Sequence, residues 1–126
     1  MILVDTSVWV DHLRRGDSRL ADLLERGVVV THPFVVGEIA CGSLSDRAAV
    51  LELLQELPTV VAADNDEALG FIERYGLYGK GIGYVDVHLL AAVALTHDAR
   101  LWTHDKRLHS VADDLSLAIQ DPGAHI

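Results

Sequence analysis

The chain begins with a short apolar run, residues 1–4, in which no polar residue alternates with the apolar ones. Such a run is typical of a strand that is buried on both faces of a parallel sheet. The polar triplet Asp5-Thr6-Ser7 follows it and supplies side chains that cap helices. We expect a helix from there through Arg15, ended by Gly16. This strand-to-helix junction favours an α/β fold.

The alternation of short apolar runs with helical patterns continues along the chain. Further strands are expected at residues 28–30, 59–62, 100–103 and 117–119. Further helices are expected at residues 18–26, 34–41, 46–54, 65–75, 86–96 and 106–112. We therefore predict an α/β three-layer sandwich, in which a mostly parallel sheet of about five strands is flanked by helices.

The length of 126 residues fits one domain, which we place at residues 1–126. Hydrophobic residues make up 50% of the chain and the mean hydropathy is +0.25, which is high for a small domain. An exposed apolar patch, and with it a homodimer or a protein partner, is therefore expected. No apolar run approaches the ~20 residues that cross a bilayer, and the N-terminus lacks a basic signal region, so we expect a cytoplasmic protein.

The single cysteine, Cys41, has no partner for an internal disulfide, and we expect it to fill the core. The sequence contains neither Cys-x-x-Cys nor His-Glu-x-x-His, the patterns of structural and hydrolytic zinc sites. The net charge of −9 has the wrong sign for binding nucleic acid by charge alone. A nucleic-acid ligand would therefore require cations or local basic patches.

Four carboxylates are expected at one edge of the sheet, beyond the carboxyl ends of the strands, where open parallel sheets bind ligands. Asp5 follows the first strand, and Asp105 follows the strand at residues 100–103. Asp86 opens the helix that leads into that strand, and Glu38 lies in the helix after the second strand. Taken singly, each residue is better explained by a helix cap or a solvated helix face.

The expected surroundings of Glu38 and Asp86 favour a functional interpretation. Phe34, Val35 and Cys41 stand at helical spacing from Glu38, as Leu89 and its neighbours do from Asp86. Carboxylates gathered on or beside apolar faces repel one another unless a cation compensates their charge. Ligation by oxygen atoms alone favours Mg²⁺ or Mn²⁺. Such an ion would activate a water molecule, neutralise phosphate charge and reconcile the acidic chain with a polyanionic substrate.

Four segments occur in order along the chain: Val4-Asp-Thr-Ser-Val-Trp9, the isolated Glu38, Asp86-Val-His-Leu-Leu-Ala-Ala92 and Leu101-Trp-Thr-His-Asp105. Together they resemble the PIN-domain ribonucleases, and the chain length resembles the VapC toxins of type II toxin–antitoxin systems. The resemblance implies a Mg²⁺- or Mn²⁺-dependent endoribonuclease in which a water activated by the ion attacks an RNA phosphodiester. It also implies a homodimer and a cognate antitoxin that blocks the site.

The resemblance also assigns roles to individual residues. Asp5 and Asp86 would be the firmest metal ligands, and Glu38 and Asp105 would complete the catalytic cluster as ligands, directly or through water. Thr6 and Thr103 would supply hydroxyls that orient carboxylates or substrate.

Other residues leave two interpretations open. The glycine-rich segment 76–83 is not a phosphate-binding loop by pattern and is expected to be a flexible loop. Its glycines would also let a nucleic-acid backbone approach, with Lys80 touching a phosphate. Lys106 and Arg107 fit a solvated helix end, with substrate contact as the alternative. His88 fits either a buried structural histidine or a group beside the site.

Two other functions compete with the nuclease. A phosphoacceptor receiver domain is also a small α/β protein, but it requires paired acids after the first strand, where this chain has Asp5 followed by Thr6. A catalytically inactive interaction module of the same fold is the second alternative, and the intact set of four acids argues against it.

The tripeptide Thr-His-Asp occurs twice, at residues 96–98 and 103–105. The first copy comes where a helix ends, so Asp98 is expected at the opposite edge of the sheet. The second copy follows the next strand, which places Asp105 beside Asp5.

Overall fold

The computed structural model describes residues 1–120 and contains a parallel sheet of three strands in the order β2-β1-β3. These strands are β1 (Ile2–Val4), β2 (Val29–Val30) and β3 (Arg100–Trp102). The central strand β1 is buried along its whole length, as its apolar run predicts. Its Leu3 pairs with Val30 on one side and with Leu101 on the other. The carboxyl ends of all three strands therefore meet at one edge of the sheet.

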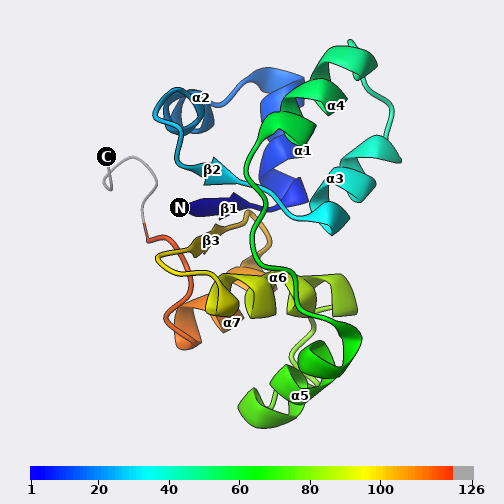
Figure 1. Ribbon diagram of the computed structural model, residues 1–126. Helices are drawn as coiled ribbons and strands as arrows, with labels where there is room; N and C mark the ends of the chain where they lie inside the picture. Colours follow the sequence, from blue (N-terminus) through cyan, green and yellow to red (C-terminus); the bar gives the residue numbers. More distant parts are fainter. Residues whose placement is uncertain (121–126) are drawn as a thin grey trace.

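Helices cover both faces of this sheet. They are α1 (Thr6–Arg15), α2 (Ser18–Glu25), α3 (Pro33–Ala40), α4 (Arg47–Glu56), α5 (Asn65–Tyr75), α6 (Tyr84–Leu95) and α7 (Lys106–Asp114). In Figure 1, α1 to α4 lie above the sheet, whereas α5, α6 and α7 lie below it. The predicted three-layer sandwich is confirmed.

The prediction of about five strands is wrong, because the described chain forms three. The segment expected at residues 59–62 contributes only one parallel bridge, between Thr31 and Thr59. Thr31 donates its N–H to the carbonyl of Pro58 and accepts from the N–H of Val60, both at 2.9 Å. The pairing does not extend further, because Pro58 has no N–H to donate and the partner chain enters α3 at Pro33.

The segment expected at residues 117–119 is likewise reduced to one bridge, between Leu101 and Ala118. Leu101 donates to the carbonyl of Leu117 at 2.7 Å and accepts from the N–H of Ile119 at 2.9 Å. Ser116 has a φ of +60°, so the chain turns sharply just before this contact. Each outer segment therefore lies beside the sheet and makes one bridge to it, without adding a full strand.

The helix α6 is the most deeply buried helix of the fold. Its residues from Val87 to Val93 are all buried, and it packs against both β3 and α5. A helix that is apolar on nearly every side is stable only inside a protein, which explains its place between the sheet and α5. Its N-terminal turn, which carries Asp86, emerges at the edge where the strands end.

Two further expectations can be compared with the structure. Cys41 is exposed, so the expectation that it fills the core is wrong; it lies just beyond the end of α3. The domain at residues 1–126 stays a prediction, since residues 121–126 lie outside the described part.

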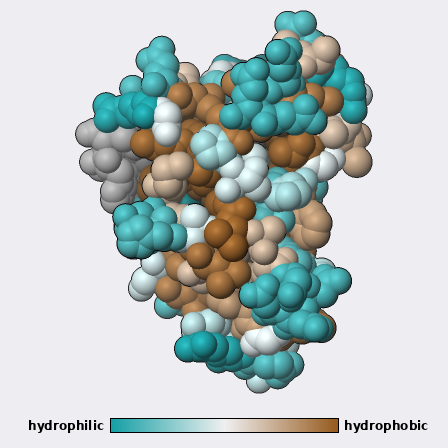
Figure 2. All heavy atoms as spheres, viewed as in Figure 1, coloured by the Kyte–Doolittle hydropathy of each residue, from teal (hydrophilic) through white to brown (hydrophobic). Residues whose placement is uncertain are grey.

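Among residues 1–120, the helices are too short or too polar to cross a membrane. Figure 2 shows hydrophobic residues in patches over the upper part and the centre of one face, with more polar residues between them.

Candidate carboxylate site

Asp5 is a buried carboxylate at the end of β1, with only 7% of its surface exposed. Its Oδ2 accepts hydrogen bonds from the hydroxyls of Ser7 and Thr103, both at 2.7 Å. Although Asp5 occupies the N-cap position of α1, its side chain makes no capping hydrogen bond. The helix-cap explanation of this residue is therefore not what the structure shows.

Asp105 follows β3 and is connected to Asp5 through Thr103. The backbone N–H of Asp105 donates to the hydroxyl of Thr103 at 3.1 Å. The side chain of Asp105 caps α7, because its Oδ1 accepts from the N–H groups of Arg107 and Leu108 at 2.9 and 3.0 Å. Asp105 thus combines the capping role with a position beside Asp5.

Asp86 lies in the first turn of α6, where its Oδ2 accepts from the backbone N–H of Gly83 at 3.0 Å. Burial raises the pKa of Asp86 above its ordinary value, and the hydrogen bond from Gly83 partly offsets this effect. The charges of Asp5, Asp105 and Glu38 raise the pKa further. The structure therefore brings Asp5, Glu38 and Asp105 within electrostatic range of Asp86. We call Asp5, Glu38, Asp86 and Asp105 the carboxylate site.

Glu38 belongs to the exposed side of α3 and is held by a residue of α1. The hydroxyl of Thr6 donates to its Oε1 at 2.7 Å. Phe34 is 41% exposed and Cys41 is also exposed, so these two expected neighbours do not shield Glu38 from solvent. Glu38 instead lines a pocket that Leu13 and Leu44 also line. The buried side of α3 is formed by Val35 and Ile39 instead.

Each carboxylate of the site has one oxygen that accepts a hydrogen bond and one oxygen without a hydrogen-bond partner among residues 1–120. The engaged atoms are Oδ2 of Asp5, Oε1 of Glu38, Oδ2 of Asp86 and Oδ1 of Asp105. None of the ion pairs among residues 1–120 includes these four residues. No three Asp, Glu, His or Cys side chains in this part of the chain form a ready-made metal cage. The site is thus a group of oriented but uncompensated carboxylates.

The sequence did not indicate the role of Ser7. Besides donating to Asp5, its hydroxyl accepts from the backbone N–H of His104 at 3.0 Å. It therefore connects the start of α1 to the turn after β3. The position of Ser7 two residues after Asp5 was the available signal, but a helix cap explained it equally well.

His88 is buried, with 3% of its surface exposed, and neither ring nitrogen has a hydrogen-bond partner among the described residues. Its ring packs edge-on against Tyr84, Phe34 and His32 at centroid distances of 4.6, 4.9 and 6.4 Å. These contacts favour the structural interpretation of His88.

Asp98 lies at the opposite edge of the sheet from the carboxylate site. Its backbone carbonyl accepts from the N-terminal ammonium group of Met1 at 3.0 Å, at the start of β1. Its φ of +56° places it in a tight turn between α6 and β3. The two Thr-His-Asp copies therefore stand at opposite ends of β3, as expected.

Known proteins resemble this chain over nearly its whole length. The PIN domain family matches residues 2–114. Ribonuclease VapC32 of Mycobacterium tuberculosis strain H37Rv is 46% identical over 121 residues, which cover 96% of this chain and 98% of that protein. VapC ribonuclease Mb1587 of Mycobacterium bovis is 30% identical over 127 residues, which cover 89% of this chain and 92% of that protein.

Proposed function

This chain belongs to the PIN-domain family, among its VapC-type ribonucleases, and we propose that its carboxylate site binds a divalent cation and hydrolyses RNA there. As a member of this group it is an endoribonuclease and the toxin of a toxin–antitoxin pair. The receiver-domain alternative is set aside by this membership. The assignment of catalysis to Asp5, Glu38, Asp86 and Asp105 is our proposal.

The observation that supports the site is that each of its four carboxylates has one oxygen without a hydrogen-bond partner in the described part of the chain. Carboxylate oxygens are the ligands that Mg²⁺ and Mn²⁺ prefer. Mg²⁺ keeps several of its waters and is commonly held by one or two carboxylates, so a complete protein cage is not required. The mutual repulsion that raises the pKa of Asp86 would be relieved by such a cation.

A divalent cation, when bound, would neutralise phosphate charge and lower the pKa of a water molecule. The protein's own contribution is to orient the carboxylates before the cation and the substrate arrive. Thr103 and Ser7 hold Asp5, and Thr6 holds Glu38. Because each hydroxyl engages one oxygen, the other oxygen of each carboxylate remains available to a ligand.

We further propose that a cognate antitoxin restrains this activity and that the enzyme acts in the cytoplasm, where its RNA substrate is found. A homodimer through α5 and α6 is supported by the exposed side chains of Leu69, Tyr75 and Leu95. These helices border a cavity of about 440 Å³ that also contains Glu67 and Arg74. A two-fold axis that packs α5 against its copy in antiparallel orientation would place Glu67 of each chain beside Arg74 of the other.

The dimer is tested by measuring molecular mass in solution by light scattering. Arg74→Glu alone should give a monomer, because it sets like charges against each other. The double variant Glu67→Arg/Arg74→Glu should restore the dimer. Equal masses for wild type and both variants would contradict this interface.

The nuclease site is tested by incubating the purified protein with RNA in Mg²⁺ or Mn²⁺. We expect cleavage that stops when EDTA is added and that is absent from Asp5→Asn. Cleavage that persists in both controls would show that another site or a contaminant is responsible. If the wild type cuts no RNA under any condition, the inactive interaction module becomes the better interpretation.

A further inference from the structure

The side chain of Arg107 lies directly against Gly81, in the glycine-rich segment before α6. A Cβ atom at Gly81 would stand 2.8 Å from Cδ and 2.9 Å from Nη1 of Arg107, closer than real Cβ contacts. Gly81 also has a φ of +79°, which side chains other than glycine rarely adopt. This close approach is possible because residue 81 is glycine.

Arg107 stands where the two segments that carry Asp86 and Asp105 meet. Its backbone N–H donates to Oδ1 of Asp105 at 2.9 Å. On the other side, Gly81 precedes Gly83, whose N–H holds Oδ2 of Asp86 at 3.0 Å. Arg107 therefore contacts both segments, through its backbone N–H at Asp105 and through its side chain at Gly81.

Arg107 is exposed and has no ion pair or side-chain hydrogen bond with any residue of the described chain. It is thus a cation held against Gly81, two residues after Asp105, whose side-chain N–H donors have no partner among residues 1–120. Guanidinium groups bind phosphate through parallel hydrogen bonds, which gives orientation as well as attraction. A protein of net charge −9 needs such a local cation to hold a polyanion.

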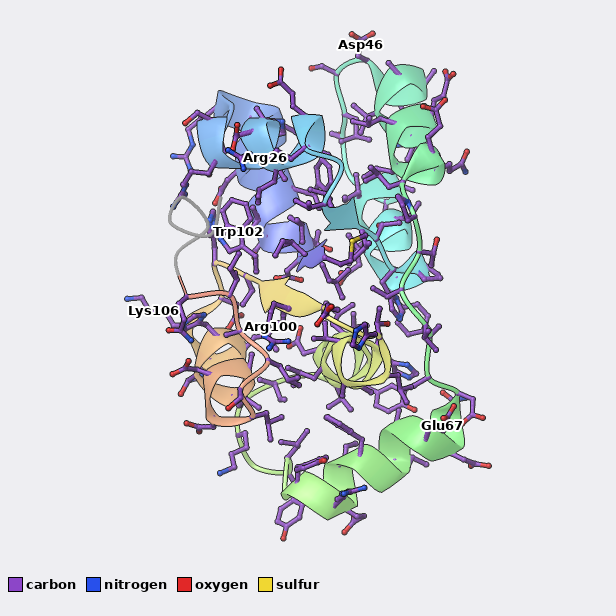
Figure 3. All side chains as sticks on the ribbon, turned by 60° about the vertical axis from the view of Figure 1, so that its left-hand side comes forward. Arg26, Asp46, Glu67, Arg100, Trp102 and Lys106 are labelled. Carbon is purple, nitrogen blue, oxygen red and sulfur yellow. The ribbon has the colours of Figure 1, made fainter. Side chains whose placement is uncertain are left out.

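We propose that Arg107, held against Gly81, binds a backbone phosphate of the RNA beside the bond that is cleaved. The proposal rests on the ribonuclease function proposed above and assigns the substrate-positioning group of that site. Gly81 serves it by leaving the space in which the arginine lies. Neighbouring Lys106 extends outward from the start of α7 on the side away from α6 (Figure 3) and is not part of this arrangement.

The first test measures binding of a fluorescein-labelled single-stranded RNA of mixed sequence by fluorescence anisotropy, with all proteins in an Asp86→Asn background to prevent cleavage. Arg107→Gln should weaken binding about five- to tenfold and lower the salt slope of log Kd by about 0.7, the share of one phosphate contact on a single strand. The matched control is Arg100→Gln, which removes the same charge at the start of β3, the opposite edge of the sheet (Figure 3). Equal effects of the two variants on affinity and salt slope would overturn the proposal.

The second test displaces Arg107 without changing charge. Gly81→Ala should weaken RNA binding, but less than Arg107→Gln does, because the new methyl group shifts the end of the arginine side chain while the positive charge remains. Gly79→Ala is the matched control, since Gly79 has a φ of +69° and open space around its Cβ position. Both variants carry similar backbone strain, and only Gly81→Ala should lose affinity. The double variant Gly81→Ala/Arg107→Gln should bind no more weakly than Arg107→Gln, whereas additive losses would contradict the proposal.

Cleavage kinetics separate this proposal from the proposed function. In the otherwise wild-type chain, Arg107→Gln should raise KM for RNA more than it lowers kcat, and Arg107→Lys should recover part of the loss. If the wild type cleaves RNA and Arg107→Gln matches Arg100→Gln, the role of Arg107 is refuted and the nuclease assignment stands. A wild type that neither binds nor cleaves RNA would refute both.

Discussion

The hydroxyl of Thr103 donates a hydrogen bond of 2.7 Å to Oδ2 of Asp5, although the two residues are 98 positions apart in the sequence. The parallel pairing of Val4 with Trp102 makes this contact possible, because each polar residue directly follows its strand. The N–H of Asp5 also donates to the carbonyl of Trp102 at 2.9 Å. The first and last of the site's carboxylates are therefore tied together through the ends of β1 and β3.

The Thr103 hydroxyl is expected to contribute to both stability and cleavage. Thr103→Val keeps the shape of the buried side chain but removes one donor to Asp5 and the acceptor for the N–H of Asp105. We expect a loss of about 1–3 kcal/mol in the free energy of unfolding and a lower cleavage rate. Urea unfolding and an RNA cleavage assay measure the two effects. Thr103→Ser retains the hydroxyl and should recover most of the cleavage; if it behaves like Thr103→Val, the hydroxyl is not the cause.

The two Thr-His-Asp copies provide a matched pair for testing the role of Asp105. Asp105→Asn keeps an oxygen that can cap α7 but removes the negative charge, so cleavage should fall at least about tenfold while stability changes little. Asp98→Asn makes the same chemical change at the opposite edge of the sheet and should leave cleavage intact. Cleavage assays alongside thermal melts measure both. Equal losses of cleavage would show that distance from the carboxylate site does not matter.

The raised pKa of Asp86 predicts that this residue destabilises the metal-free protein. The folded state binds the carboxyl proton more tightly than the unfolded state does, so stability falls as the pH rises above the ordinary carboxyl pKa. At pH 7 without metal, Asp86→Asn should therefore raise the melting temperature by roughly 2–5 °C while abolishing cleavage. Below the ordinary carboxyl pKa this advantage should disappear.

Divalent cations should reverse the order of these two proteins. Mn²⁺ is expected to raise the melting temperature of the wild type, because it binds the assembled carboxylates and not the unfolded chain. Asp86→Asn should respond less, since it lacks one of the proposed ligands. Melting curves in EDTA and in increasing Mn²⁺ provide the measurement. An unchanged wild-type melting temperature in saturating Mn²⁺ would contradict the proposed metal site.

His32 should make the fold sensitive to mild acid. Burial, and secondarily the charge of His88, lower the pKa of His32 to about 4 from an ordinary value of 6.5. As the pH falls below 6.5, the unfolded chain takes up a proton that the folded chain does not, so stability is lost progressively down to pH 4. The loss can reach about 3 kcal/mol, at about 1.4 kcal/mol for each pKa unit.

The variant His32→Asn isolates this effect. Nδ1 of His32 accepts from the N–H of Phe34 at 2.9 Å and so caps α3, a role that asparagine can retain. Because asparagine does not titrate, the variant should lose less stability than the wild type between pH 7 and pH 5. Urea unfolding across that range is the measurement. Parallel pH profiles for the two proteins would show that the acid sensitivity arises elsewhere.

Features that depend on neighbouring residues could be predicted from the sequence. The helix at residues 65–75 is confirmed to the residue, because Asp64 and Glu67 form a capping box and Gly76 ends it in the left-handed conformation. Parallel-sheet topology predicted that the four carboxylates would meet, since the ends of parallel strands share one edge. The structure places them within electrostatic range, and their catalytic roles stay a prediction.

Features that depend on distant segments were decided by the tertiary structure. The β-like patterns at residues 59–62 and 117–119 could not show that each segment would form only a single bridge. The number of paired residues depends on where the neighbouring strand leaves the sheet, and that is not visible in the pattern of either segment. The hydrogen bond of Ser7 with the N–H of His104 and the contact of Arg107 with Gly81 likewise join residues far apart in the sequence. The exposure of Glu38 depends on how α3 packs. Periodicity and capping act along the chain, whereas strand register and helix packing fix which atoms meet across it.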